Sequence, residues 1–236
     1  MKKSILGIIG IIMIVTLASG CIGTGSGNVV KEDRKLSGFN QITLNGDINL
    51  ILKQGDNESV VVEAEDNIVS EIKTEVSNNK LTISHNAPTA ILPTKPINVY
   101  VTVKDINSID VSGSGKVEGS NINANNLDLT ISGSGNTKLN NITAKNIKSV
   151  ISGSGKIELS GVTESQNIKI EGSGTYNSRN LQSDDTVITI DGSGQTTVNT
   201  SDNLQITITG SGKVSYLGDP TIKQTINGNG EINKIT

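Results

Sequence analysis

Aromatic residues are almost absent from this 236-residue sequence. They make up 2% of the chain, with no Trp and a single Phe, whereas hydrophobic residues together reach 33%. That hydrophobic share is large enough to build a core, so the chain is not disordered. The core must then consist of Ile, Val and Leu in repetitive layers, which favours a solenoid over a sandwich.

Positive charge, cysteine and histidine are scarce as well. The formal net charge is −3 and no basic stripe with interleaved aromatic residues occurs, so we expect no nucleic-acid partner. One Cys and one His are too few for a metal site built from these ligands, and we expect neither a metal nor another cofactor. His85 is the only base available to a Ser-His-Asp triad, and its place between a strand and a loop predicts a structural role.

Residues 1–20 have the pattern of a lipoprotein signal peptide. Two lysines precede an apolar run, residues 5–17, that is too short to span a bilayer comfortably. The run leads into Leu-Ala-Ser-Gly-Cys at residues 17–21, which resembles the lipobox of prokaryotic lipoproteins. The resemblance implies that a lipid on Cys21 anchors an exported protein to the outer face of the membrane. The alternative is an ordinary export signal in which Cys21 is incidental.

Gly-Ser-Gly recurs every 18 to 20 residues in the C-terminal half. Apolar residues before each copy alternate with period two, as in Leu127, Leu129 and Ile131, which predicts half-buried strands. The alternation resumes in the same phase after each copy, so both glycines are predicted to point inward and the Ser outward. The copies begin at residues 113, 133, 153, 172, 192 and 210, and Gly228-Asn229-Gly230 closes the series.

The polar stretches between these corners are too short and too poor in helix formers to hold a helix. The chain must therefore coil, so that successive copies of one strand lie parallel. The sequence predicts an all-β fold, a right-handed parallel β-helix (β-solenoid) with coils of about 20 residues over residues 106–236. An antiparallel meander with Gly-Ser-Gly as its hairpin turn is the alternative.

The rest of the chain lacks this regular series, and residues 36–105 contain no Gly-Ser-Gly. Residues 21–35 are rich in small and polar residues and predict a flexible tether. Residues 36–105 contain several strand patterns and are predicted to form an irregular β region that caps the solenoid. No helix is expected to cover the C-terminal coil, so molecules could associate with one another through their coil ends.

Two sets of outward residues are candidate sites. Glu171 and Asp191 occupy the same position in adjacent coils and could bind a cation or act as acid and base, although solvated outward carboxylates are the simpler interpretation. A row of corner hydroxyls could match a repetitive ligand such as a glycan or ice, although Ser also suits a corner because it is small and soluble. That row consists of Ser114, Ser134, Ser154, Ser173, Ser193 and Ser211, with Asn229 after them.

Four segments of the chain carry a family resemblance. They are Phe39-Asn40-Gln41-Ile42, the stretch from Ile48 to Gly55, Leu81-Thr82-Ile83, and the stretch from Ile109 to Gly115. Together they resemble the GIN-domain family, envelope proteins also labelled auto-transporter adhesin head domains. The resemblance covers the chain from about Leu36 to Lys234 and implies a β-helical fold at the cell surface with a role in adhesion. It brings no catalytic residues.

These observations favour a non-catalytic, lipid-anchored surface protein. Its partners would be the membrane, through Cys21, and a surface ligand such as a glycan or a protein. One alternative is a carbohydrate-active β-helix enzyme that acts on envelope or environmental polysaccharide through Glu171 and Asp191. A second alternative is a structural element of the envelope that assembles through coil ends.

Overall fold

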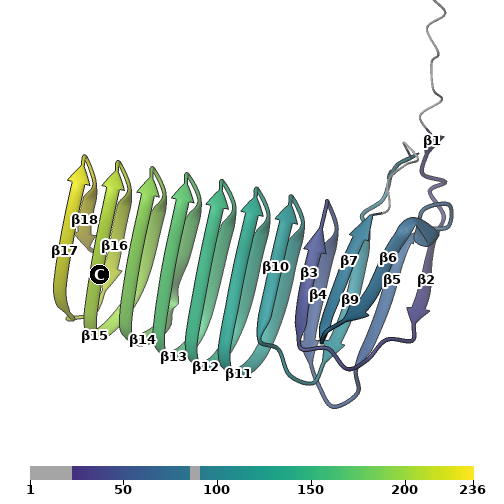
Figure 1. Ribbon diagram of the computed structural model, residues 1–236, viewed down its shortest axis with the longest axis horizontal. Coiled ribbons are helices and arrows are strands. Elements are labelled where there is room, and N and C mark those ends of the chain that lie inside the picture. Colours follow the sequence, from purple (N-terminus) through teal and green to yellow (C-terminus); the bar gives the residue numbers. More distant parts are fainter. Residues whose placement is uncertain (1–22, 86–90) are drawn as a thin grey trace, which may run out of the picture.

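The computed structural model describes residues 23–85 and 91–236. The described chain forms a rod of stacked coils, closed at one end by a group of antiparallel strands (Figure 1). Its only helical element is a 3₁₀ turn, η1, at Val69–Glu71. The predicted signal peptide and Cys21 lie outside the described residues.

The repeat region consists of long strands that each continue through a polar return to the next corner. Every neighbouring pair of these strands is parallel, residue for residue along most of its length. The prediction of a parallel β-solenoid with coils of about 20 residues is therefore confirmed, and the antiparallel meander is wrong. The five strands are β11 (Lys116–Gly133), β12 (Asn136–Gly153), β13 (Lys156–Gly172), β14 (Thr175–Gly192) and β15 (Gln195–Gly210).

Each coil contributes one segment to each of two facing layers. We call the layer that leads into the corners, for example residues 127–133, the entry sheet. The layer that leaves the corners, for example residues 116–120, is the exit sheet. Inward Ile, Leu and Val side chains of both layers form one continuous core along the rod.

The two glycines of a corner do different things, so the prediction that both point inward is only half right. The first glycine is exposed or half-buried and has a φ between +108° at Gly113 and +127° at Gly192. The second glycine is buried, and a Cβ on Gly155 would lie 2.5 Å from Cγ2 of Ile131. The first glycine turns the chain and the second leaves room for the core.

Regular coils begin well before residue 106, the predicted boundary. β3 (Gln41–Asn45) pairs in parallel with β10 (Ser108–Gly113), and β4 (Asn49–Gln54) pairs in parallel with β11. A second early coil is formed by β7 (Lys80–His85) and β9 (Asn98–Val103), which pair in parallel with β3 and β4. Four strands of the region expected to be an irregular cap thus belong to the solenoid.

Antiparallel strands close the N-terminal end. β5 (Ser59–Glu65) pairs with β9, β6 (Ile72–Ser77) pairs with β7, and η1 joins β5 to β6. β2 (Val29–Arg34) pairs antiparallel with β5 and extends the exit sheet by one strand. The prediction of a flexible tether through residue 35 is therefore wrong for β2, because its backbone is paired and Val30 packs against the core.

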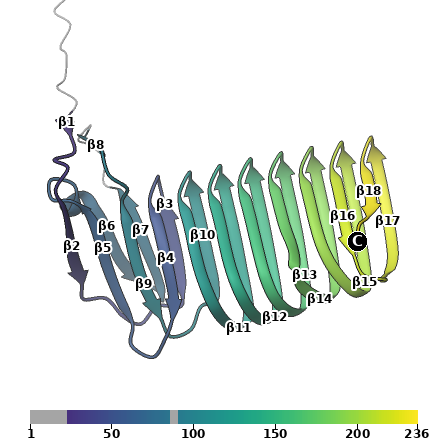
Figure 2. The ribbon, with the colours of Figure 1, turned by 180° about the vertical axis from the view of Figure 1, so that it is seen from behind.

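Two further features mark the ends of the rod. β1 (Gly23–Thr24) pairs in parallel with β8 (Ile91–Leu92) beside the cap, on the side of the corners (Figures 1 and 2). At the opposite end, β16 (Lys213–Leu217), β17 (Thr221–Gly228) and β18 (Glu231–Lys234) continue the stack. β17 pairs with β15 and β18 pairs with β16, so together they form the C-terminal coil.

Candidate functional site

The corner serines form an exposed ridge along one edge of the rod. From Ser134 onward each is fixed by its backbone, because its N–H donates to the carbonyl of the first corner glycine in the preceding coil, as in Ser134 N to Gly113 O at 2.9 Å. Neighbouring hydroxyls therefore repeat at about the 4.8 Å spacing of paired strands. We call this set the serine ridge: Ser114, Ser134, Ser154, Ser173, Ser193 and Ser211, all exposed.

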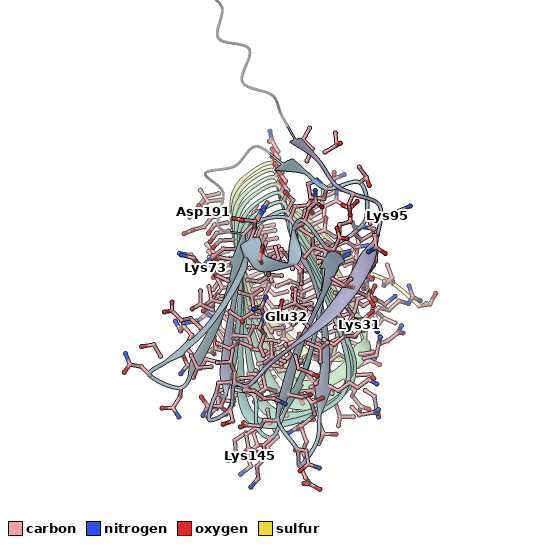
Figure 3. The ribbon with its side chains drawn as sticks, turned by 90° about the vertical axis from the view of Figure 1, so that its right-hand side faces the viewer. Lys31, Glu32, Lys73, Lys95, Lys145 and Asp191 are labelled. Carbon is pink, nitrogen blue, oxygen red and sulfur yellow. The ribbon has the colours of Figure 1, made fainter. Side chains whose placement is uncertain are left out.

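The predicted acidic pair is brought together as the sequence indicates. Glu171 and Asp191 are register partners on β13 and β14, and both are exposed on the corner side of the entry sheet. Asp191 projects outward near that edge in Figure 3. Ser152 occupies the same position in the preceding coil, so one row changes from hydroxyl to carboxylate along the rod.

The Glu171 carboxylate already has two partners. Lys169 Nζ lies 2.6 Å from Oε1, and Ser152 Oγ donates to Oε2 at 3.0 Å. Both partners lower the pKa of Glu171 below its ordinary value, and the Lys169 ammonium has a larger effect than the Ser152 hydroxyl. An exposed, ionised and paired carboxylate does not have the raised pKa of a general acid, so this geometry is a weak basis for glycosidase chemistry.

Metal ligands and His85 are the other chemistry to consider from the sequence. The described residues contain no group of three or more His, Cys, Asp and Glu side chains placed to hold a metal ion. His85 is the last residue of β7 and lines a hollow with Asp47 and Lys95. The structural role expected for this histidine stays a prediction.

The exit sheet carries an outward patch that the sequence reasoning missed. Tyr100 on β9 lies beside Ile51 on β4, above a shallow hollow of about 240 Å³ that Asn49 and Asn98 also line. The Tyr100 hydroxyl donates to Glu63 Oε1 at 3.0 Å, and Lys31 Nζ lies 4.9 Å from the ring centroid. The signal was present in the alternation of residues 97–103, which directs the ring outward.

Charges around that ring are mutually compensated. Glu63 accepts hydrogen bonds that lower its pKa, and the bond from Asn98 has a larger effect than the bond from Lys31. The hydrogen bond from Tyr100 to Glu63 raises the pKa of the Tyr100 phenol. Lys31 Nζ lies 3.0 Å from Glu63 Oε2, and the Lys31 pKa is raised in turn. The patch is therefore a polar, half-buried surface rather than a reactive centre.

Threonines on the entry sheet form a second outward row that the sequence reasoning missed. They occupy one register position in successive coils, and most are half-buried. The row is interrupted by Asp110, Val150 and Lys169, so its chemistry changes along the rod. Its threonines are Thr43, Thr82, Thr130, Thr189, Thr207 and Thr225.

Among the helical segments of the described chain, none is long and apolar enough to cross a membrane. Cys21 lies outside the described residues, two positions before Gly23, where β1 begins. The position of the predicted lipid attachment is therefore defined only by its distance along the chain from β1.

Solved structures share this architecture. A protein from Bacteroides fragilis, described as a "putative adhesin", superposes with a TM-score of 0.84 at 25% identity, covering 90% of this chain and 99% of that one. A "putative lipid binding protein" from Parabacteroides distasonis gives a TM-score of 0.75, also at 25% identity, covering 90% and 99%. A "putative adhesin" from Parabacteroides merdae, at 20% identity and a TM-score of 0.73, covers 90% of this chain and 98% of its own, and shows the fold alone.

Sequence comparison gives the family. A search of curated proteins finds no match. A family profile, in contrast, matches residues 38–220, which span β3 to β16 and so include both the early coils and most of the repeats. The chain belongs to the family described as "Putative auto-transporter adhesin, head GIN domain".

Proposed function

We propose that this protein is exported, held at the outer face of the membrane by a lipid on Cys21, and uses its solenoid as a non-catalytic binding body. Membership of an adhesin-like family supports a place at the cell surface. Proteins of the same architecture are described as a "putative adhesin" and a "putative lipid binding protein", which supports binding as the activity. The lipobox-like residues 17–21 support the anchor.

The observation that favours binding over catalysis is the register between coils. Outward side chains of neighbouring strands stand directly opposite one another, so each face of the rod repeats its chemistry at intervals of about 4.8 Å. Such a surface can contact an extended or repetitive ligand over several coils. Catalysis would instead require a few acidic, basic or nucleophilic side chains that converge on one point and have shifted pKa values.

A binding screen tests the binding role. The soluble form should begin at Ile22, because β2 belongs to the cap and a form that begins at Leu36 would remove it. This protein, presented to immobilised glycans and to host and bacterial surface preparations, is expected to retain at least one ligand class. Retention on none of these surfaces would contradict the proposal.

Lipidation is tested separately. Cys21→Ser should move the protein from the membrane fraction to the soluble fraction, and the N-terminal peptide of the parent should carry the mass of acyl chains. A parent that is soluble and free of acyl chains would refute the anchor while leaving the binding role intact.

The enzymatic alternative makes an opposite prediction for Glu171 and Asp191. If the protein turns over polysaccharide, replacement of both residues by Ala should abolish product formation. We expect no turnover by the parent on envelope or environmental polysaccharides. Turnover that the double variant loses would replace our proposal with catalysis.

A further inference from the structure

The segment that begins at Gly23, two positions after Cys21, is hydrogen-bonded to the cap. Gly23 and Thr24 of β1 are register partners of Ile91 and Leu92 of β8. The N–H of Gly25 donates to the carbonyl of Leu92 at 2.9 Å and so lengthens this small ladder. The chain is therefore attached to the folded body within a few residues of the predicted lipid.

A buried carboxylate holds both sides of that ladder. Glu65, at the end of β5, is 1% exposed. It accepts hydrogen bonds from the N–H of Gly27 at 2.7 Å, from the N–H of Thr94 at 2.8 Å and from the Thr94 hydroxyl at 2.5 Å. One side chain of the cap thus fixes the segment that follows β1 and the segment that follows β8.

The two residues after Glu65 add further bonds to the same segment. The Asp66 carboxylate accepts from the Ser26 hydroxyl at 2.5 Å and from the Asn28 amide at 2.9 Å. The Asn67 side chain accepts from the N–H of Ser26 and donates to the carbonyl of Thr24, each at 3.0 Å. We call Glu65, Asp66 and Asn67 the clasp.

The clasp fixes where a lipid on Cys21 would enter a membrane. Only two residue steps separate Cys21 from Gly23, and a chain of that length spans at most about 7 Å. β1 lies at the cap end of the rod, on the side of the corners, in both views (Figures 1 and 2). A lipid attached there would bring this part of the cap to the bilayer surface.

The residues next to β1 suit a phospholipid surface. Leu92 is 60% exposed, the largest value among the exposed large hydrophobic residues of the described chain. Lys95, three residues on, is exposed on the same upper part of the cap, whereas Lys145 marks the opposite edge, where the chain makes its polar returns (Figure 3). An aliphatic side chain beside a basic one matches the acyl boundary and the phosphate groups of a lipid headgroup layer.

We propose that the clasp holds the lipidated N-terminus so that Leu92 and Lys95 contact the membrane, with the corner side of the cap facing the lipid. This inference rests on the proposed lipidation of Cys21. The occupant of the surface is the anionic phospholipid bilayer that the anchor already enters. The return edge of the rod then points away from the membrane and is open to ligands.

The position of Leu92 can be measured on the intact lipidated protein. Leu92→Cys and Val162→Cys each introduce one free thiol for a fluorescent label, since the Cys21 sulfur is occupied by lipid. Val162 is the matched control, because it is 49% exposed and its register partner Thr143 lies two residues from Lys145. In phosphatidylcholine and phosphatidylglycerol vesicles that contain a spin-labelled lipid, we expect several-fold stronger quenching at position 92 than at position 162. Equal quenching at the two positions would overturn the inference.

A clasp variant tests whether these contacts depend on the cap. Glu65→Ala with Asp66→Ala should reduce quenching at position 92 to near the level at position 162 while the protein still floats with the vesicles. Glu63→Ala, on the same strand but outside the clasp, should leave quenching at position 92 unchanged. Circular dichroism of the double variant verifies that the solenoid is folded, and unchanged quenching in a folded double variant would refute the role of the clasp.

Flotation separates the two proposals. A parent that does not float with vesicles and carries no acyl chain would refute the lipid anchor, and this inference would fall with it. A parent that floats but shows no difference between positions 92 and 162 would refute only the membrane contact of Leu92 and Lys95.

Discussion

At the scale of single residues, the corner explains why the motif repeats with so little change. A Cβ on Gly153 would lie 2.6 Å from the carbonyl oxygen of Gly133, the oxygen that accepts the N–H of Ser154. The φ of +119° at Gly153 is also one that other residues rarely adopt. Sterics therefore require glycine at this position, whereas the intervening Ser contributes mainly its backbone N–H.

Gly153→Ala should lower the free energy of unfolding by about 2 kcal/mol or more, because backbone strain and contact with the neighbouring carbonyl both act against it. Ser154→Ala is the matched control and should change that free energy by less than about 0.5 kcal/mol. Urea unfolding followed by circular dichroism measures both. Equal effects of the two variants would mean that the corner is not limited by sterics.

Gln166, a polar residue inside the core, gives a second prediction at the scale of single residues. Gln166 is buried between coils, where its carbonyl accepts the Tyr176 hydroxyl at 2.9 Å and its amide donates to Ser183 Oγ at 2.8 Å. Gln166→Leu should lower the free energy of unfolding by about 1–3 kcal/mol, because it removes the partner of buried hydroxyls. Gln205→Leu, at an exposed position, is the control in the same urea titration, and a cost as large as that of Gln166→Leu would contradict this explanation.

At the scale of elements, the sequence predicts the regular coils better than their order. Period-two alternation and the spaced glycines were sufficient for β11 to β15, because each strand pairs with its sequence neighbour. The coil of β3 and β4 could not be placed in this way. It lies between β7 and β10, which are separated from it in sequence, and its corner has Gly46 but no Gly-Ser-Gly.

The same limit applies to the candidate surfaces. The acidic pair and the serine ridge were predictable because they follow from position within a repeat. The clasp was not, because Glu65 meets Gly27 and Thr94 only through folding of segments far apart in the sequence. β2 was missed because residues 21–35 were interpreted together as a tether, on the basis of the small and polar residues that precede β2.

The clasp also predicts a dependence of stability on pH. The Thr94 hydroxyl, with the backbone N–H groups of Thr94, Gly27 and Lys95, lowers the pKa of Glu65 below its ordinary value. The folded protein then binds fewer protons here than the unfolded chain. The stabilisation is therefore complete above about pH 4.3 and is lost as the pH falls through the lowered folded value.

Glu65→Gln tests this dependence, because it keeps the shape of the side chain and removes the titrating group. The unfolding midpoint of the parent should exceed that of the variant near neutral pH, and the difference should shrink below about pH 4. Thermal unfolding over a series of buffers measures the difference. A difference that stays constant down to about pH 2 would contradict a role for the Glu65 charge.

At the scale of the whole molecule, the cap and the repeats form one folding unit. The coil of β3 and β4 lies between the coil of β7 and β9 on one side and the strands β10 and β11 on the other. The connection from β9 to β10 therefore crosses that coil and joins the cap to the repeats. The core is likewise continuous from Phe39 in the early coils to Val214 near the other end. We therefore expect that the repeats would not fold normally without residues 41–54, since β10 and β11 would lose their neighbours.

The C-terminal coil bears on whether molecules stack end to end. Its inward positions carry Gln224, the register partner of Ile206, and Lys234, the register partner of Tyr216. Lys234 forms an ion pair with Asp219. Polar and charged groups at inward positions of an edge oppose strand addition, because a stacked neighbour would have to bury them.

A soluble form of residues 22–236 should therefore remain monomeric at high concentration. Gln224→Ile combined with Lys234→Val continues the apolar rows of the core to the exposed end, so we expect it to form dimers or longer stacks. Light scattering over a concentration series distinguishes the two, and Lys223→Val, on the outward face of β17, is the control for added hydrophobicity. If the parent itself forms stacks that the double variant does not enhance, then Gln224 and Lys234 do not block the end, and assembly through coil ends becomes the better account of this protein in the envelope.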